Sequence, residues 1–157
     1  MSDLFYAVVV VTLVGAAVTV GALFAFSTFI MRALKRLDDA EGIRAMQQIN
    51  KTVYTPWFMG PFFGTSLLSI GAAVFALTNM DQEWWMLLLS AGLLYAIGMF
   101  GFTAVGNVPL NKRLAGMDAD GVATAEYWRR YLALWTRWNH ARVIFGVMSI
   151  ILYSMVL

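Results

Sequence analysis

The sequence contains no cysteine and one histidine, and only 13% of its 157 residues are charged. Without cysteine the chain cannot form a disulfide, an iron–sulfur cluster or a thiolate zinc site. One histidine cannot provide bis-histidine haem ligation or a multi-histidine metal cage. About a quarter of the residues of a water-soluble domain are charged, so this chain is not a typical soluble protein.

The sequence is instead rich in long hydrophobic runs. Hydrophobic residues make up 61% of the chain, and the mean hydropathy is +0.71. No charged residue occurs in residues 4–31, 52–80 or 84–111, and each run exceeds the roughly 20 residues that cross a bilayer. Residues 143–157 are too few, so a fourth span must begin near Trp138, and its helical pattern extends back to about Thr124.

The sequence therefore predicts an all-α fold, an integral membrane four-helix bundle with a long fourth helix. The spans are expected near residues 4–31, 54–79, 84–108 and 136–157. Together they form a single membrane domain, residues 1–157, with too little chain left for a Rossmann fold or a nucleotide-binding loop.

Basic residues indicate the topology. All eleven Lys and Arg residues lie within residues 32–51 and 112–142. By the positive-inside rule, the loops near residues 32–53 and 109–135 are cytoplasmic and both chain ends face outward, in a multi-pass protein of the cell (inner) membrane. Residues 4–31 lack a preceding basic region, so we interpret them as a retained span and not as a signal peptide. Membrane lipid is therefore the expected partner of the chain, and nucleic acid is not.

An amphipathic cytoplasmic helix is expected between the first two spans. Asp38 or Asp39 can cap it. Its apolar positions recur at helical spacing through Ile43 and Met46 and continue to Trp57, so the helix should lead directly into the second span.

Small residues recur at four-residue spacing in two spans, at Ala17, Gly21 and Ala25 and at Gly60 and Gly64. This spacing lets helix backbones approach closely, so it predicts tight packing at these positions.

A weak internal repeat relates residues 26–50 to residues 102–139. Each copy runs from a phenylalanine and a hydroxyl residue, through a basic pair and an acidic turn, to Asn50 or Asn139. Either common ancestry or shared topology explains it.

Polar side chains within the spans gather in the cytoplasmic half. Lipid offers them no partners, so they must bond inside the bundle or form a site. On the fourth helix Trp135, Asn139 and Arg142 share one face, while His140 lies at its edge. Further along the helix the same face carries Trp128, Gly146, Ser149 and Tyr153, so it is expected to point into the bundle. The candidate site residues are Asn50, Tyr54, Trp57, Thr103, Asn107, Asn111, Trp135, Trp138, Asn139, His140 and Arg142.

Structural roles are open for the same residues. The tryptophans fit an aromatic belt at the membrane surface. Arg142 can extend its side chain to that surface, and His140 can be an ordinary histidine of the interface. The asparagines fit hydrogen bonds between helices.

Three motifs carry a resemblance to a known family. They are residues 46–50 (MQQIN) followed by Trp57, residues 103–111 (TAVGNVPLN), and residues 135–142 (WTRWNHAR). In these motifs, and over nearly its whole length, the chain resembles the anthrone oxygenase family of four-helix membrane proteins. It departs at Arg32, where members often have proline.

The resemblance implies an oxidation. Some fungal members are associated with oxidising polyketide anthrones to anthraquinones with dioxygen and no evident metal or flavin, whereas most bacterial members have no assigned function. No cofactor or metal is therefore predicted, and molecular oxygen is the co-substrate of such an oxygenase.

Such chemistry needs a base, hydrogen-bond donors for an enolate oxygen and an aromatic pocket. We expect His140 or a water to be the base, and Asn139, Asn107 and Arg142 to be the donors. Stacking on the substrate is expected from the aromatic side chains of Trp135, Trp138 and Tyr54. The catalytic set is then His140, Asn139 and Arg142, and the other candidates bind an aromatic or quinone-like molecule.

Non-enzymatic functions are the alternative. A small bundle with this composition also suits an accessory or assembly subunit of a membrane complex, or a lipid- or quinone-binding protein. It could associate as a homo-oligomer or with other membrane subunits. A haem protein with His140 as sole axial ligand is a weaker hypothesis.

Overall fold

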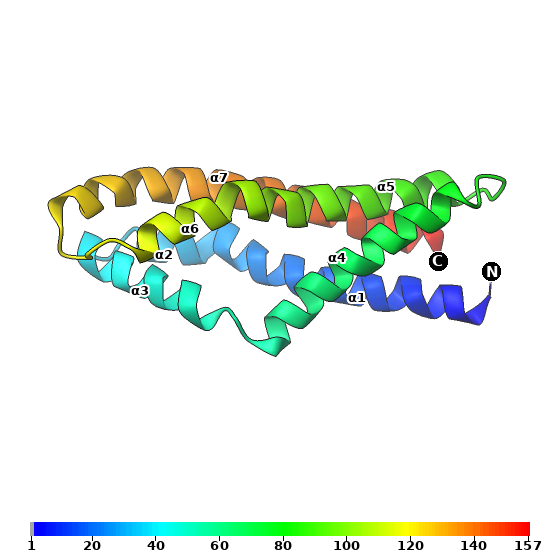
Figure 1. Cartoon of the computed structure of the whole chain (residues 1–157), viewed down its shortest axis with the longest axis horizontal. Coiled ribbons are helices and arrows are strands. Elements are labelled where there is room, and N and C mark those ends of the chain that lie inside the picture. Colours follow the sequence, from blue (N-terminus) through cyan, green and yellow to red (C-terminus); the bar gives the residue numbers. More distant parts are fainter. Residues whose placement is uncertain (1) are drawn as a thin grey trace.

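A computed structural model describes residues 2–157, and this part of the chain is helical throughout apart from short connections (Figure 1). The helices long and apolar enough to cross a membrane are Asp3–Leu34, Pro56–Leu77, Trp85–Ala115 and Val122–Val156. The protein is therefore a multi-pass membrane protein, and the predicted all-α four-helix bundle is confirmed.

The first long helix is interrupted by a π-helical turn. It consists of α1 (Asp3–Ala25), the π-helical residues Phe26–Ile30, and the short α2 (Met31–Leu34). A π-helical turn displaces backbone hydrogen bonds from their usual partners, and such turns are frequent at functional sites.

The third long helix is interrupted in the same way. It begins as α5 (Trp85–Tyr95), continues through the π-helical residues Ala96–Gly101 and Thr103–Asn107, and ends as α6 (Val108–Ala115). Pro109 does not end the helix, because it lies in the first turn of α6, where its missing N–H costs little. The predicted loop of residues 109–135 is consequently mostly helical, and only residues 116–121 connect α6 to the last helix.

The predicted amphipathic helix is α3 (Asp39–Thr52), in which Ile43 and Met46 are buried. It does not run on into α4 (Pro56–Leu77), because residues 53–55 are not helical. Pro56 disfavours the helical conformation in the residue before it, and Thr55 is extended. The two helices form a V whose apex projects from the bundle (Figure 1).

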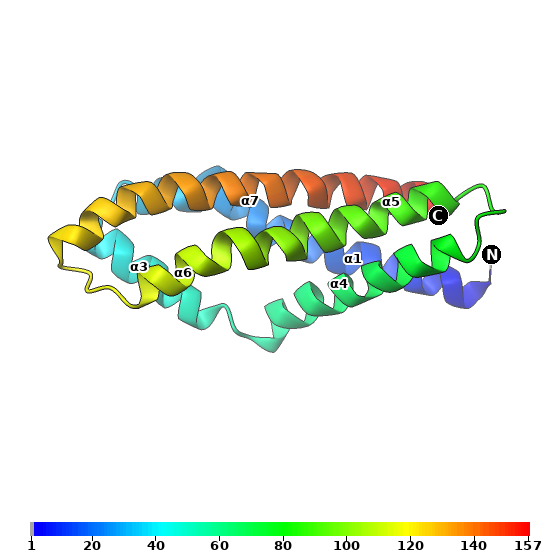
Figure 2. The ribbon, with the colours of Figure 1, turned by 45° about the horizontal axis from the view of Figure 1, so that its top comes forward.

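The last helix, α7 (Val122–Val156), is unbroken over 35 residues and lies beside α5 and α6 (Figure 2). It begins close to the expected Thr124. The predicted inward face is confirmed, because Trp128, Asn139, Arg142, Gly146 and Tyr153 are buried.

The close helix contacts do not fall where the small-residue spacing predicts them. A side chain at Gly21, Gly60 or Gly64 would meet no other atom within 4 Å, so these glycines face outward. Close contacts occur instead at Gly92 and Gly98. A Cβ added to Gly92 would overlap Ser69, and a Cβ added to Gly98 would overlap Phe145. Which glycines allow close approach depends on neighbouring helices that the local spacing does not specify.

The internal repeat has a structural counterpart in both halves. Each copy contains a π-helical segment, a short helix, a turn and a further helix. In the first copy these helical parts are Phe26–Ile30, α2 and α3, and in the second they are Thr103–Asn107, α6 and α7. The copies differ in the helix that follows the turn, because α3 and α4 are separate whereas α7 is continuous. That difference opens the bundle beside residues 53–55.

Candidate functional site

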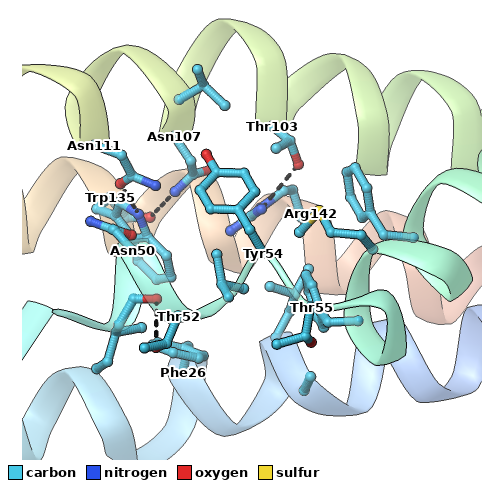
Figure 3. Close-up of a pocket in the computed structure, with 18 of the residues that line it drawn as sticks. Phe26, Asn50, Thr52, Tyr54, Thr55, Thr103, Asn107, Asn111, Trp135 and Arg142 are labelled. Carbon is cyan, nitrogen blue, oxygen red and sulfur yellow. Dashed lines mark hydrogen bonds between the residues drawn. The ribbon is translucent and has the colours of Figure 1, made fainter. Parts of the chain in front are cut away.

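A cavity of about 340 Å³ lies where the break between α3 and α4 leaves the bundle open (Figure 3). Residues of α1, α3, α4, the third long helix and α7 all line it. The aromatic side chains of Phe26, Phe58 and Phe62 contribute to its walls, and Tyr54, which is 74% exposed, lies at its open side. The volume falls within the usual range for small-molecule sites.

Arg142 is the charged group of this cavity. Its side chain is only 4% exposed, and its Nη1 donates to Thr103 Oγ1 over 3.0 Å. The guanidinium carbon lies 5.5 Å from the centre of the Trp135 ring. No carboxylate lines the cavity, and within residues 2–157 Arg142 forms no ion pair. Because burying an unpaired charge is costly, this arrangement indicates a place for an anionic ligand group.

Asn139, one turn before Arg142 on α7, fixes the orientation of the Arg142 side chain. Its Oδ1 accepts a hydrogen bond of 2.6 Å from Arg142 Nη2. Its Nδ2 donates to Leu23 O at 2.7 Å and to Ser27 Oγ at 2.8 Å. Both amide hydrogens are thus used inside the bundle.

The π-helical segments supply the partners of this network. Ser27 belongs to Phe26–Ile30, and Thr103 begins Thr103–Asn107. Thr103 Oγ1 donates to Met99 O at 2.6 Å, which leaves its lone pairs free to accept from Arg142. Both irregular segments therefore meet at the Asn139–Arg142 pair.

Asparagine side chains form the other polar wall. Asn111 Oδ1 accepts from Tyr131 Oη at 2.8 Å and from Trp135 Nε1 at 2.9 Å. Asn107 Nδ2 donates to Trp135 O at 3.2 Å, as Figure 3 shows.

Several polar atoms at the cavity are buried without a partner among the described residues. They are Asn50 Nδ2, Asn107 Oδ1 and Arg142 Nε. Buried polar groups are normally hydrogen-bonded, so these atoms are unmet hydrogen-bonding capacity next to the cavity.

A family model described as anthrone oxygenase matches residues 53–152. The chain belongs to the anthrone oxygenase family. The matched region contains Tyr54, Thr103 and Arg142 of the cavity but begins after Asn50. Comparisons with curated proteins and with solved structures give no match.

Most of the site residues predicted for this family member come together. The residues that line the cavity are Asn50, Tyr54, Thr103, Asn107, Asn111, Trp135 and Arg142. They come from three separate parts of the chain, and the helical phase of Trp135 and Arg142 had indicated that these two share a face.

The remaining predicted site residues lie elsewhere. Trp57, at the start of α4, is 88% exposed. Trp138 packs against Phe102 with ring centres 5.5 Å apart, on another side of α7. His140 is exposed and lines a different cleft, because one residue along a helix turns the side chain by 100° from Asn139. The structure therefore does not place His140 as a base for this cavity.

The sequence analysis also missed part of the site. Phe26, Phe58 and Phe62 line the cavity but resemble any other apolar residue of a span. The repeat gave a sequence signal for Phe26 alone, because this phenylalanine begins its first copy.

Proposed function

We propose that this protein is a cofactor-independent oxygenase that oxidises an aromatic substrate bound as its enolate or phenolate anion beside Arg142. The observation that carries the proposal is a buried guanidinium that has no carboxylate partner in the described part of the chain and faces a cavity with aromatic walls. Membership of the anthrone oxygenase family supports the reaction class.

The chemistry requires stabilisation of negative charge more than covalent help from the protein. Loss of a proton from the benzylic CH₂ of an anthrone gives a delocalised anion. Its negative charge lies partly on the ketone oxygen, where a nearby cation and neutral hydrogen-bond donors stabilise it. The anion carbon forms a bond to dioxygen, and protonation gives a hydroperoxide. Loss of the second benzylic proton and cleavage of the O–O bond release water and leave the quinone carbonyl. One dioxygen is consumed and one water is formed per CH₂ oxidised.

The residues at the cavity fit the stabilising role. Arg142 supplies a buried positive charge at the cavity, Asn50 carries an unpartnered Nδ2 beside it, and the phenylalanine rings provide an apolar wall for the substrate. Asn139 uses both amide hydrogens elsewhere, so we assign it as a positioning residue for Arg142 and not as a donor to substrate.

Among residues 2–157, no Asp, Glu, His or Lys lines the cavity. We therefore assign proton removal to water, which reaches the open side near Tyr54, or to ionisation of the substrate before it binds. His140 has no part in this step. The protein contributes by making the anion the favoured form inside the cavity.

Oxygen uptake by the full chain in mild detergent, with a tricyclic anthrone as substrate, tests the proposal. We expect Arg142→Met to lower the enzyme-dependent rate by about a hundredfold or more, the usual cost of losing an oxyanion-stabilising group. Arg130→Met removes an exposed arginine from the same helix and should leave the rate within about twofold. An unchanged rate in Arg142→Met would contradict the proposal.

Binding without turnover is a second candidate, favoured by the absence of a base among the lining residues. In that case the cavity holds a quinone or an aromatic anion for another protein. Ligand retention in native mass spectrometry that depends on Arg142, combined with no enzyme-dependent oxygen uptake, would identify a binding protein.

A further inference from the structure

A second cleft, of about 670 Å³, lies between α2 and α7 and is separate from the Arg142 cavity. Its charged lining consists of Arg32, Lys35, Arg129 and Arg137, with Asp39 as the one carboxylate, and His140 lies beside them. The cations come from the end of α2 and the residue after it, and from α7, which is distant in the sequence, so the tertiary structure is what gathers them.

We propose that this cleft binds the phosphate group of an anionic membrane lipid. Four cations face one carboxylate, and within residues 2–157 none of the four forms an ion pair. All four side chains are exposed, so a phosphate can reach them without any change in the bundle. Arginine and lysine commonly bind phosphate in proteins, and basic pockets between membrane helices bind lipid headgroups.

The surface next to the cleft favours a lipid over a free phosphate. Ile144 and Val147 lie four and seven residues beyond His140, which places them on the same face of the regular helix α7. They are 58% and 41% exposed. An acyl chain can therefore lie along α7 toward the membrane interior while its phosphate occupies the cleft.

The lipid site does not depend on the oxygenase proposal. The lining of the cleft shares no residue with the lining of the Arg142 cavity. Ser27 nevertheless connects the two, because it lines the cleft and accepts a hydrogen bond from Asn139 Nδ2.

Native mass spectrometry of the full chain in detergent, with added lipid, tests the proposal. Phosphatidylglycerol and phosphatidylcholine with identical acyl chains are compared, and glycerol phosphate is added as a competitor that lacks acyl chains. We expect phosphatidylglycerol to be retained at least about fivefold more than phosphatidylcholine, and glycerol phosphate to displace it poorly. Equal retention of the two lipids would overturn the proposal, and efficient displacement by glycerol phosphate would show that the site binds free phosphate instead.

A charge-matched pair of variants locates the binding. Arg32→Gln with Arg137→Gln should weaken phosphatidylglycerol retention about tenfold, since each basic residue near the membrane surface contributes to headgroup binding. Lys112→Gln with Arg130→Gln removes two exposed cations outside the cleft and should change retention less than twofold. Equal losses in both double variants would show attraction by net charge alone and overturn a defined site. Circular dichroism and gel filtration verify that both variants fold.

Discussion

Two neutral side chains hold the guanidinium of Arg142, and no counter-ion pairs with it among the residues that the structure describes. Thr103 and Asn139 hold its terminal nitrogens, and neither neutralises its charge. A snorkelling arginine would place its guanidinium in water, but this one is 4% exposed. The side chain is therefore held at the cavity, where a negatively charged ligand group would compensate it.

Asn139 offers a test of positioning at the residue scale. In Asn139→Ala the Arg142 side chain loses one anchor, so we expect oxygen uptake to fall at least about tenfold, because misplacing a catalytic group by about 1 Å has a large effect on rate. In Asn139→Asp the new carboxylate pairs with Arg142, so the KM for an anionic substrate should rise more than in Asn139→Ala. Steady-state oxygen uptake over a range of substrate concentrations measures both effects.

Asn79→Ala, which changes a half-buried asparagine just after the end of α4 and far from Arg142 in the sequence, is the control. Wild-type rates in both Asn139 variants, with folding intact, would show that Asn139 does not position Arg142.

At the scale of elements, the interruptions of the helices create the site. The π-helical segments bring Ser27 and Thr103 to the Asn139–Arg142 pair, and the non-helical residues 53–55 leave room for the cavity. By contrast, α7 is continuous and presents Trp135, Asn139 and Arg142 along one rigid face. A rigid helix opposite interrupted ones suits a cavity whose charged group must stay fixed.

Close packing of α4 and α5 gives the prediction at this scale. A Cβ at Gly92 would overlap the Ser69 backbone oxygen and lie 3.1 Å from Ala73 Cβ. Gly92→Ala should therefore force the two helices apart and cost about 1–3 kcal/mol of unfolding free energy. Thermal unfolding in detergent, followed by circular dichroism, measures the loss.

Gly64→Ala is the matched control, because a Cβ at this position in α4 meets nothing within 4 Å. It should leave the unfolding temperature unchanged or slightly raised, since alanine favours helix over glycine. Equal destabilisation by both substitutions would contradict the assigned packing.

At the scale of the whole molecule, the two ends of the bundle differ in character. One end carries α2, α3, the turn between α6 and α7, and the basic residues, while the other carries the described start of α1, the turn between α4 and α5, and the end of α7 (Figure 1). By the positive-inside rule we propose that the basic end is cytoplasmic, which also places the Arg142 cavity and the lipid cleft in the inner half of the membrane.

Because the sequence has no cysteine, single cysteines can report this orientation without background. A membrane-impermeant thiol reagent added to intact cells should label Gln82→Cys, in the turn between α4 and α5. It should label Asp118→Cys, in the turn between α6 and α7, only after the membrane is permeabilised. Labelling of both variants in detergent is the control, and the reverse pattern in cells would contradict the proposed orientation.

The sequence by itself determined the spans, the long last helix and the inward face of that helix. These features follow from local rules, because bilayer thickness sets the length of a span and the helical period sets its faces. The inward face, with Asn139 and Arg142, was therefore readable before any contact was known.

Only the tertiary structure decided which residues meet. It opened a cavity beside Arg142, and it gathered Arg32 and Lys35 with Arg129 and Arg137 in one basic cleft. It also placed Gly92 in a close helix contact and left Gly64 open. Such outcomes depend on how separate helices pack, and therefore on shapes that distant segments present to one another rather than on any local pattern.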